Sequence, residues 1–298
     1  MRFSMKRYYL FLILFVLVTP WSSAQMSIED ELYAAVMAIE GRSHIGRNEF
    51  IKEQLQKSGI GYVTAPFRHV FQRQNDTIVI SGENIIVRVG HGAKRIVIGA
   101  HYDAAAESPG ANDNGSGVAV LLSLIKHLQD NYWNYGIDFC FFDQEEMGSM
   151  GAIYYIKQFI IPKKHLVMIN LDIEGSGEEL YVGPVGMNTR FVMRYVREAG
   201  LKTGFPFVEF PEFPASDHVP FGQLNLENIA ISVVPKGDAA RLSKFVKNGY
   251  KSDSADVPQV MKVMHSVDDR SNFVTPSALK MSFEYTRTLL LLLNESKR

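Results

Sequence analysis

Residues 101–117 read HYDAAAESPGANDNGSG, and this stretch decides the fold. A short apolar and β-branched segment precedes it (KRIVIGA, 94–100), and a second apolar segment follows it (VAVLLSLI, 118–125). The first has the composition of a buried parallel strand, and the second is typical of a helix packed on a core. In open α/β sheets, ligands bind beyond the carboxyl ends of the strands, at loops such as this one. We therefore expect the functional site here.

Side chains able to bind a metal recur at similar points, each predicted just after an apolar strand. His101 and Asp103 are two residues apart, so on an extended strand end they point to the same side. The further candidates are Asp113, Glu145, Glu146, Asp172 and His265. Each alone has another explanation, as a capping acid, a turn residue or a surface histidine. Together, two imidazoles and several carboxylates favour zinc, and the excess of carboxylates favours two ions with a shared ligand.

The composition is that of a globular protein. The chain has 298 residues, 46% of them hydrophobic, and a formal net charge of −1. This supports one large core and gives no basic surface for nucleic acid, so we expect no nucleic-acid partner. The single cysteine, Cys140, lies in a strand-like segment, which predicts a buried thiol and excludes an intramolecular disulfide.

The first 24 residues have the form of a secretory signal peptide. Three basic residues precede an apolar segment at 8–18, and the small residues of 22–24 suit cleavage. An uncleaved anchor is the alternative, but the apolar segment is shorter than the ~20 residues that a spanning helix needs. We predict a mature chain of residues 25–298 in the periplasm or outside the cell, without stable membrane insertion.

The remaining sequence alternates strands and helices. Two or three antiparallel strands are expected at 62–89, at one edge of a sheet, and the charged segment 236–257 is expected to be a long surface excursion. Other predicted strands are 94–100, 137–142, 165–173, 180–182 and 229–234. The predicted helices are 27–59, with a break around 41–46, 118–131, 153–159, 189–199 and 276–293. This alternation predicts one α/β domain with three αβα layers around a mixed, mostly parallel sheet.

Six segments carry a resemblance to a known family: GAHYD, PGANDNGSGVA, EEMGSMGA, NLDIEG, SDHVPF and HSVDD. In this order and spacing they resemble the secreted di-zinc aminopeptidases of the bacterial leucyl-aminopeptidase and aminopeptidase Y type, over about residues 30–295. The resemblance implies a phosphorylase/hydrolase-like zinc exopeptidase fold for residues 25–298. It also implies two zinc ions and, as substrates, peptides with a free N-terminus.

The same resemblance implies roles for the ligand-type residues. His101 and Asp172 would bind one ion, Glu146 and His265 the other, and Asp113 would bridge them. The peptide bond after the bridging aspartate would be cis.

Six further residues receive roles, the first four by the same comparison and the last two, Asp268 and Asp269, from their position just after His265. Asp103 would accept the second ring N–H of His101. Glu145, next to a ligand, would be the general base. Asp217 and His218 would lie at the rim of the site, with a role in substrate contact or a purely structural one. Asp268 and Asp269 would orient His265.

Two alternatives remain open. Secreted glutaminyl cyclases share the fold but use one zinc ion to form pyroglutamate. They usually have tryptophan where this chain has Met264, and they lack the sequence found here at 114–117, whereas 141–143 and 217–221 resemble them. A binding ectodomain that kept the fold would be expected to lose Glu145 or several ligands. Substrate preference cannot be carried over from the family, because 236–258 is longer than expected.

Overall fold

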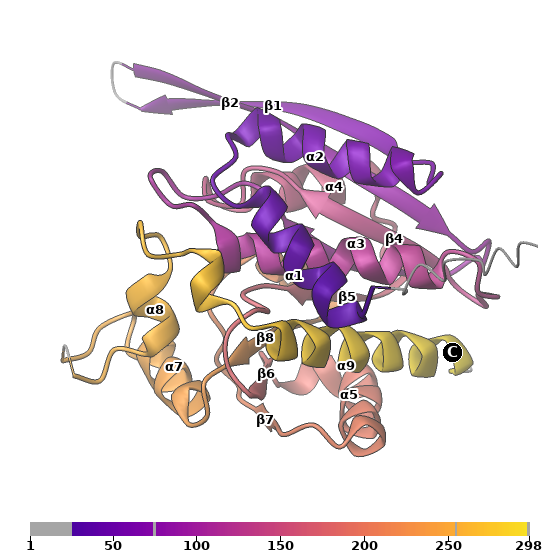
Figure 1. Cartoon of the computed structure of the whole chain (residues 1–298). Helices are drawn as coiled ribbons and strands as arrows, with labels where there is room; N and C mark the ends of the chain where they lie inside the picture. The colour runs from indigo at the N-terminus through magenta and orange to yellow at the C-terminus, as the bar shows by residue number, and fades with distance from the viewer. Residues whose placement is uncertain (1–25, 74–75, 254, 297–298) are drawn as a thin grey trace, which may run out of the picture.

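The computed structural model describes residues 26–73, 76–253 and 255–296, which form an eight-stranded sheet between helices (Figure 1). The strand order is β1-β2-β4-β3-β5-β8-β6-β7. Neighbours from β4 to β8 run parallel, as do β6 and β7, and the other pairs are antiparallel. The strands are β1 (Val63–Arg73), β2 (Asp76–Val89), β3 (Arg95–His101), β4 (Gly136–Phe142), β5 (His165–Leu171), β6 (Glu179–Gly183), β7 (Phe207–Glu209) and β8 (Glu227–Val234). The mixed, mostly parallel sheet predicted from the sequence is confirmed.

Helices cover both faces of the sheet, because side chains of the central strands alternate between the two faces. In β3, Ile96 and Ile98 pack into the larger apolar core, and Val97 packs into a smaller core on the opposite face. The larger core includes residues of α1 (Ile28–Ile39), α2 (His44–Lys57), α3 (Gly117–Leu128), α5 (Arg190–Thr203) and α9 (Pro276–Glu295). The smaller core includes residues of α4 (Met150–Phe159) and α6 (His218–Gln223). The three layers expected from the sequence are therefore present.

The helix ends follow local sequence signals. Ser27 and Ser43 accept backbone N–H bonds at the starts of α1 and α2. At the start of α9, Pro276 occupies the first turn and Thr275 accepts the N–H of Ala278. Such caps each contribute about 1 kcal/mol, and proline fits the first turn because the N–H missing there has no helical partner.

Two expectations need correction. The segment 236–257 is more than a surface excursion, because it contains α7 (Asp238–Lys247) and is followed by α8 (Gln259–Val263). These helices contribute to a third apolar cluster through Ala239, Leu242 and Val260. The charged sequence therefore contains apolar residues at helical spacing, which form the buried face of α7. His265 does not end a strand but lies in the loop after α8.

The predicted signal peptide, residues 1–24, lies outside the described residues. Within the described ranges, none of the helices has the length and hydropathy needed to cross a bilayer.

Candidate metal centre

Neighbouring parallel strands end at one edge of the sheet, and each brings acidic or imidazole side chains there. His101 is the last residue of β3, Asp172 directly follows β5, and Glu145 and Glu146 lie in the loop after β4. Because β3 pairs in parallel with both β4 and β5, the three carboxyl ends lie side by side. The fold thus brings His101 close to Asp172, although the two residues are 71 positions apart in the sequence.

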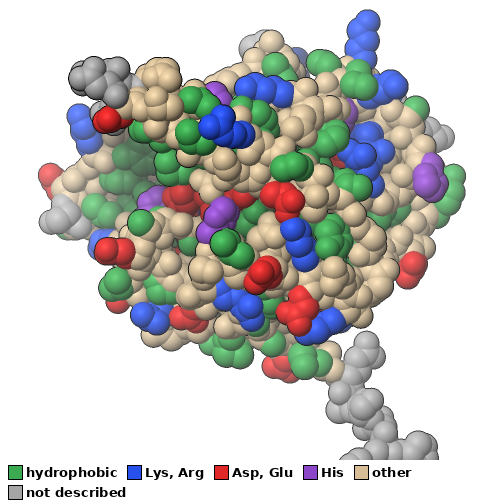
Figure 2. Space-filling model, turned by 90° about the horizontal axis from the view of Figure 1, so that it is seen from above, with side chains coloured by type: hydrophobic (Ala, Val, Ile, Leu, Met, Phe, Trp, Pro, Cys, Tyr) green, Lys and Arg blue, Asp and Glu red, His purple; other side chains and the backbone are tan. Residues whose placement is uncertain are grey.

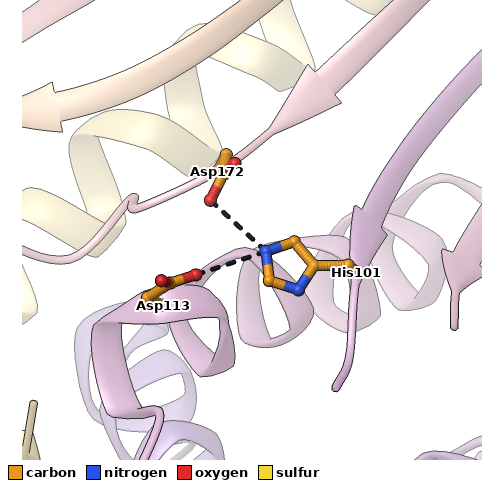
Figure 3. A group of neighbouring side chains, drawn as sticks. All are labelled: His101, Asp113 and Asp172. Atoms are coloured by element: carbon orange, nitrogen blue, oxygen red, sulfur yellow. Dashed lines mark ion pairs between the residues drawn. The ribbon is translucent and has the colours of Figure 1, made fainter. Parts of the chain in front are cut away.

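His101, Asp113 and Asp172 form the first candidate group, shown in Figure 3. Nε2 of His101 lies 3.2 Å from Oδ1 of Asp113 and 3.6 Å from Oδ1 of Asp172. The three side chains come from a strand end, the helical turn Ala111–Ser116, and the residue after β5. One ligand atom from each lies within 4.8 Å of the others, which is compatible with a shared cation.

Asp113, Glu146 and His265 form the second group. Nε2 of His265 lies 3.1 Å from Oδ2 of Asp113 and 3.1 Å from Oε2 of Glu146. The other carboxylate oxygen of Glu146, Oε1, is buried and has no hydrogen-bond partner. Asp113 therefore belongs to both groups, with one oxygen toward each. Buried polar atoms normally have a partner, so the unpaired Oε1 of Glu146 is consistent with a ligand atom for a metal ion.

The charges fit a divalent metal. Burial lowers the pKa of His101, but the carboxylates around it outweigh burial and hold that pKa well above its usual range. Hydrogen bonds to Asp113 and Glu146 raise the pKa of His265 to about 10. Burial would raise the pKa of Asp113, yet the two imidazoles hold it below its usual range. Without metal, both imidazoles thus favour the protonated form. Two imidazoles with three carboxylates suit zinc, which displaces such protons.

Glu145 lies beside both groups and forms a third close set with His101 and Glu146. The hydroxyl of Ser149 donates to Oε1 of Glu145 at 3.3 Å. Burial raises the pKa of Glu145 to about 8, and nearby carboxylates add to this effect. A carboxyl group with a pKa near neutrality can both take up and release a proton, as a general base and acid must.

Asp103 supports the loop between β4 and α4, residues 143–149, which carries Glu145 and Glu146 and is called the glutamate loop below. Its carboxylate oxygens accept the backbone N–H groups of Glu145 at 3.0 Å and Glu146 at 3.1 Å. Oδ1 of Asp103 lies 3.5 Å from Nδ1 of His101, and the same ring nitrogen lies 3.3 Å from the Asp103 carbonyl oxygen. The shortest bonds of this carboxylate thus go to the glutamate loop, a contact that sequence reasoning missed.

Asp269 holds the loop of Asp113. It accepts the backbone N–H of Asn112 at 2.8 Å and that of Asp113 at 3.0 Å. The side chain expected to orient His265 therefore orients Asp113, and Asp268 is exposed. Burial raises the pKa of Asp269 to about 6, while these two N–H bonds lower it.

The backbone next to the ligands takes uncommon conformations. The Asp113–Asn114 peptide bond is cis, as the resemblance predicts. Ile173, which follows Asp172, has φ of 56°, and His265 has φ of 61°. A β-branched side chain rarely takes this left-handed conformation, and residues held in it cluster at functional sites.

Asp217 and His218 lie inside the protein rather than at a rim. Both are buried, and both oxygens of Asp217 and Nδ1 of His218 lack partners. Burial raises the pKa of Asp217 well above its usual range, with Glu145 adding to the effect, and burial lowers the pKa of His218 to about 4. Neither lines the cavity beside the metal-binding groups. The structural role left open from the sequence fits this position better than substrate contact.

Arg47 is a buried cation that sequence reasoning missed. Its side chain is 1% exposed, and Nη2 donates to the carbonyl oxygens of Pro109 at 2.7 Å and Gly110 at 2.9 Å. Through these two hydrogen bonds, Arg47 fixes the loop between His101 and Asp113. The only available signal was its position on the face of a predicted helix that also carries apolar residues.

His44, which is not among the candidates named from the sequence, also contacts this region. Its Nε2 lies 2.6 Å from Oδ1 of the buried Asp143, which is the first residue of the glutamate loop. This hydrogen bond raises the pKa of His44, against the effect of burial.

A cavity of about 70 Å³ opens beside the candidate metal-binding side chains. One side is formed by His101, Asp113, Glu145, Asp172 and His265. The other side is mainly apolar and consists of Ile173, Phe213, Pro214, Ala215, Ser232 and Met264. Figure 2 shows histidine and acidic side chains next to a hollow lined with hydrophobic side chains. A substrate can thus place a reacting polar group at the acids and an apolar group against the opposite wall.

Comparison with known proteins gives concordant results. A model of the family described as peptidase family M28 matches residues 84–289. Aminopeptidase YwaD of Bacillus subtilis is 34% identical over 139 residues, which cover 45% of this chain but only 30% of YwaD. A zinc aminopeptidase from Bacillus subtilis superposes with a TM-score of 0.71 at 14% identity, over 90% of this chain and 95% of the other. Porphyromonas gingivalis glutaminyl cyclase superposes with a TM-score of 0.65 at 20% identity, over 88% and 97%. These superpositions show a shared fold.

Proposed function

Because the chain belongs to peptidase family M28, we propose that it is a zinc-dependent aminopeptidase that removes single residues from the free N-termini of peptides. One observation carries the proposal: two candidate metal-binding groups share Asp113, and Glu145 lies close to both and lines the cavity next to them. In the proposed ligand set, His101 and Asp172 would hold one zinc ion, Glu146 and His265 would hold the other, and Asp113, which belongs to both groups, would be shared between them.

The reaction is the hydrolysis of the first peptide bond. Bound zinc ions would supply Lewis-acid polarisation of the scissile carbonyl and would make water a better nucleophile. Glu145 takes a proton from the attacking water and returns it to the leaving amine. Asp103 keeps Glu145 in place through the two backbone N–H bonds of the glutamate loop. The apolar wall of the cavity receives the side chain of the first residue.

Cyclisation of N-terminal glutamine is the second candidate, since a glutaminyl cyclase shares the fold. The contacts of His101 with both Asp113 and Asp172 favour the peptidase, because they provide a second metal-binding group. The apolar wall next to Met264 also offers few polar partners for a glutamine amide.

We expect acetylation of the substrate amine to abolish cleavage. An aminopeptidase recognises the free α-amine next to the scissile bond, and carboxylates that can bind this amine line the cavity. The measurement compares release of the first residue from a free peptide and from its acetylated form, with and without chelator. A glutamine-peptide cyclisation assay runs beside it. Equal cleavage of the two peptides contradicts an aminopeptidase, and pyroglutamate formation without cleavage favours the cyclase.

We also propose export, with a mature chain that begins at about Gln25. The basic start, the apolar segment 8–18 and the small residues 22–24 support it. N-terminal sequencing of the protein recovered from outside the cytoplasm is expected to find this terminus. An intact Met1 on membrane-bound protein contradicts the proposal.

A further inference from the structure

Half of the residues in the apolar wall of the cavity belong to an irregular segment, residues 210–215, which lies between β7 and α6 and is called the wall segment below. Phe213, Pro214 and Ala215 of this segment line the cavity, and no lysine or arginine does so among the described residues. The sequence FPEFPA contains two prolines, and no helix or strand includes it. Its position therefore depends on side chains of the elements around it.

On the inner side, the sheet holds this wall segment. The N–H of Phe210 donates to the carbonyl oxygen of Val182 at 3.1 Å. The ring of Phe213 stacks on that of Tyr181, with centroids 4.6 Å apart and planes 13° apart. The Tyr181 hydroxyl donates to the carbonyl oxygen of Glu212. These contacts fix the start and the middle of the segment but not its end at Ala215.

On the outer side, α7 and the turn after it hold the rest. The backbone N–H of Ala215 donates to the hydroxyl of Tyr250 at 3.0 Å. The hydroxyl of Ser243, in α7, donates to Oε2 of Glu212 at 2.8 Å. Met264 packs against the same apolar cluster as α7 and also lines the cavity. The segment that was expected to be a surface excursion thus forms the outer support of the wall.

Tyr250 itself occupies an uncommon conformation. Its φ is 62°, and an aromatic residue rarely takes the left-handed region. Its N–H donates to the carbonyl oxygen of Phe245 at 2.9 Å, and the two rings meet edge to face at 5.7 Å. The residue is 45% exposed, so burial alone does not explain why it is held there. In this conformation the Tyr250 hydroxyl accepts the N–H of Ala215.

We propose that Tyr250 and Ser243 are positioning residues that set the width of the substrate pocket and select peptides whose first residue has a compact, uncharged side chain. The inference rests on the proposed aminopeptidase function and adds a substrate class to it. Tyr250 holds Ala215 against the cavity, Ser243 holds Glu212, and the wall stays close to the acids. When the tether is lost, the wall moves outward and larger first residues enter.

The test uses the zinc-loaded protein and three chromogenic substrates with alanine, leucine or phenylalanine as the first residue. Wild type is expected to prefer alanine and leucine. Tyr250→Phe, alone and with Ser243→Ala, is expected to raise the phenylalanine-to-alanine ratio of kcat/KM by about threefold or more through KM. Zinc content and kcat for alanine are expected to stay near wild type.

Hydrogen exchange provides an independent readout of the tether. In Tyr250→Phe the Ala215 amide is expected to exchange about three- to tenfold faster, the effect of losing one hydrogen bond. Tyr132→Phe is the matched control, because it removes the hydroxyl of a tyrosine that is 84% exposed and does not line the cavity. It should change neither quantity.

The outcomes separate the inference from the function on which it rests. Normal activity with an unchanged phenylalanine-to-alanine ratio in both variants overturns the role in selection. Equal loss of activity on all three substrates also overturns it, since that result indicates general destabilisation. Inactivity of zinc-loaded wild type on every substrate rejects the aminopeptidase function, and the role in selection falls with it. The exchange rate of the Ala215 amide then still reports whether the tether exists.

Discussion

Glu145→Gln is expected to lower kcat by about 10²–10⁴-fold, which is the usual contribution of a general base. The amide has nearly the shape of the carboxyl group but cannot accept the proton of the attacking water. Zinc content is expected to stay near that of wild type, because Glu145 lies outside the proposed ligand set. The measurements are steady-state kinetics on a peptide with a free N-terminus and metal analysis of the same preparation.

Asp103→Asn is the informative comparison for this variant. Its carboxylate binds the backbone of the glutamate loop and lies near His101, so the change should weaken metal affinity or activity by about 10–100-fold. The two variants therefore differ in which quantity changes. Full activity of Glu145→Gln would reject the assignment of the base, even though the family is established.

Asp113→Ala is expected to lower the occupancy of both zinc ions. Each oxygen of Asp113 faces a different imidazole, so its loss removes a ligand from both groups and leaves two cations without a shared anion. The loss of affinity should exceed the ~10–100-fold that removal of an outer-shell partner costs. Metal analysis after dialysis against limiting zinc measures the effect.

Asp172→Ala provides the contrast, because Asp172 belongs to one group only. It should lower the occupancy of one ion and spare the other. Asp268→Ala, at an exposed acid close in sequence to His265, is the neutral control. A wild-type protein that binds a single zinc ion when saturated would contradict the two-ion proposal and strengthen the cyclase alternative.

The strands and the residues at their ends could be predicted from the sequence because the signal is local. Apolar segments such as the one before His101 indicate buried strands, and the polar residues directly after them are brought to one edge by parallel pairing. The same logic found Asp172 and the glutamate loop. His265 was identified by type but placed on a strand, since an apolar residue pair next to it does not distinguish a strand end from the end of a short helix.

The supporting contacts could not be predicted, because they join distant parts of the chain. Asp269 binds the backbone of Asn112 across 157 positions, and the Tyr250 hydroxyl binds Ala215 across 35. The spacing of apolar residues predicts helices and strands but not which distant polar residues form hydrogen bonds with each other. Arg47 is a similar case, since a single cation in an amphipathic helix does not show that it is buried against carbonyl oxygens.

The proposed zinc ligands lie between residues 101 and 265: His101 ends a strand, and the other four come from four separate segments between strands and helices. No short fragment of the chain contains a complete ligand group. The ion-binding arrangement therefore arises only after the strands that carry these residues have paired in the sheet. Metal capture then becomes a late event that reports completed folding, and its free energy adds to the stability of the finished protein. If the chain crosses a membrane unfolded, it leaves the cytoplasm without its ions. The metals available where folding ends, rather than where translation occurs, then decide which ion the protein acquires.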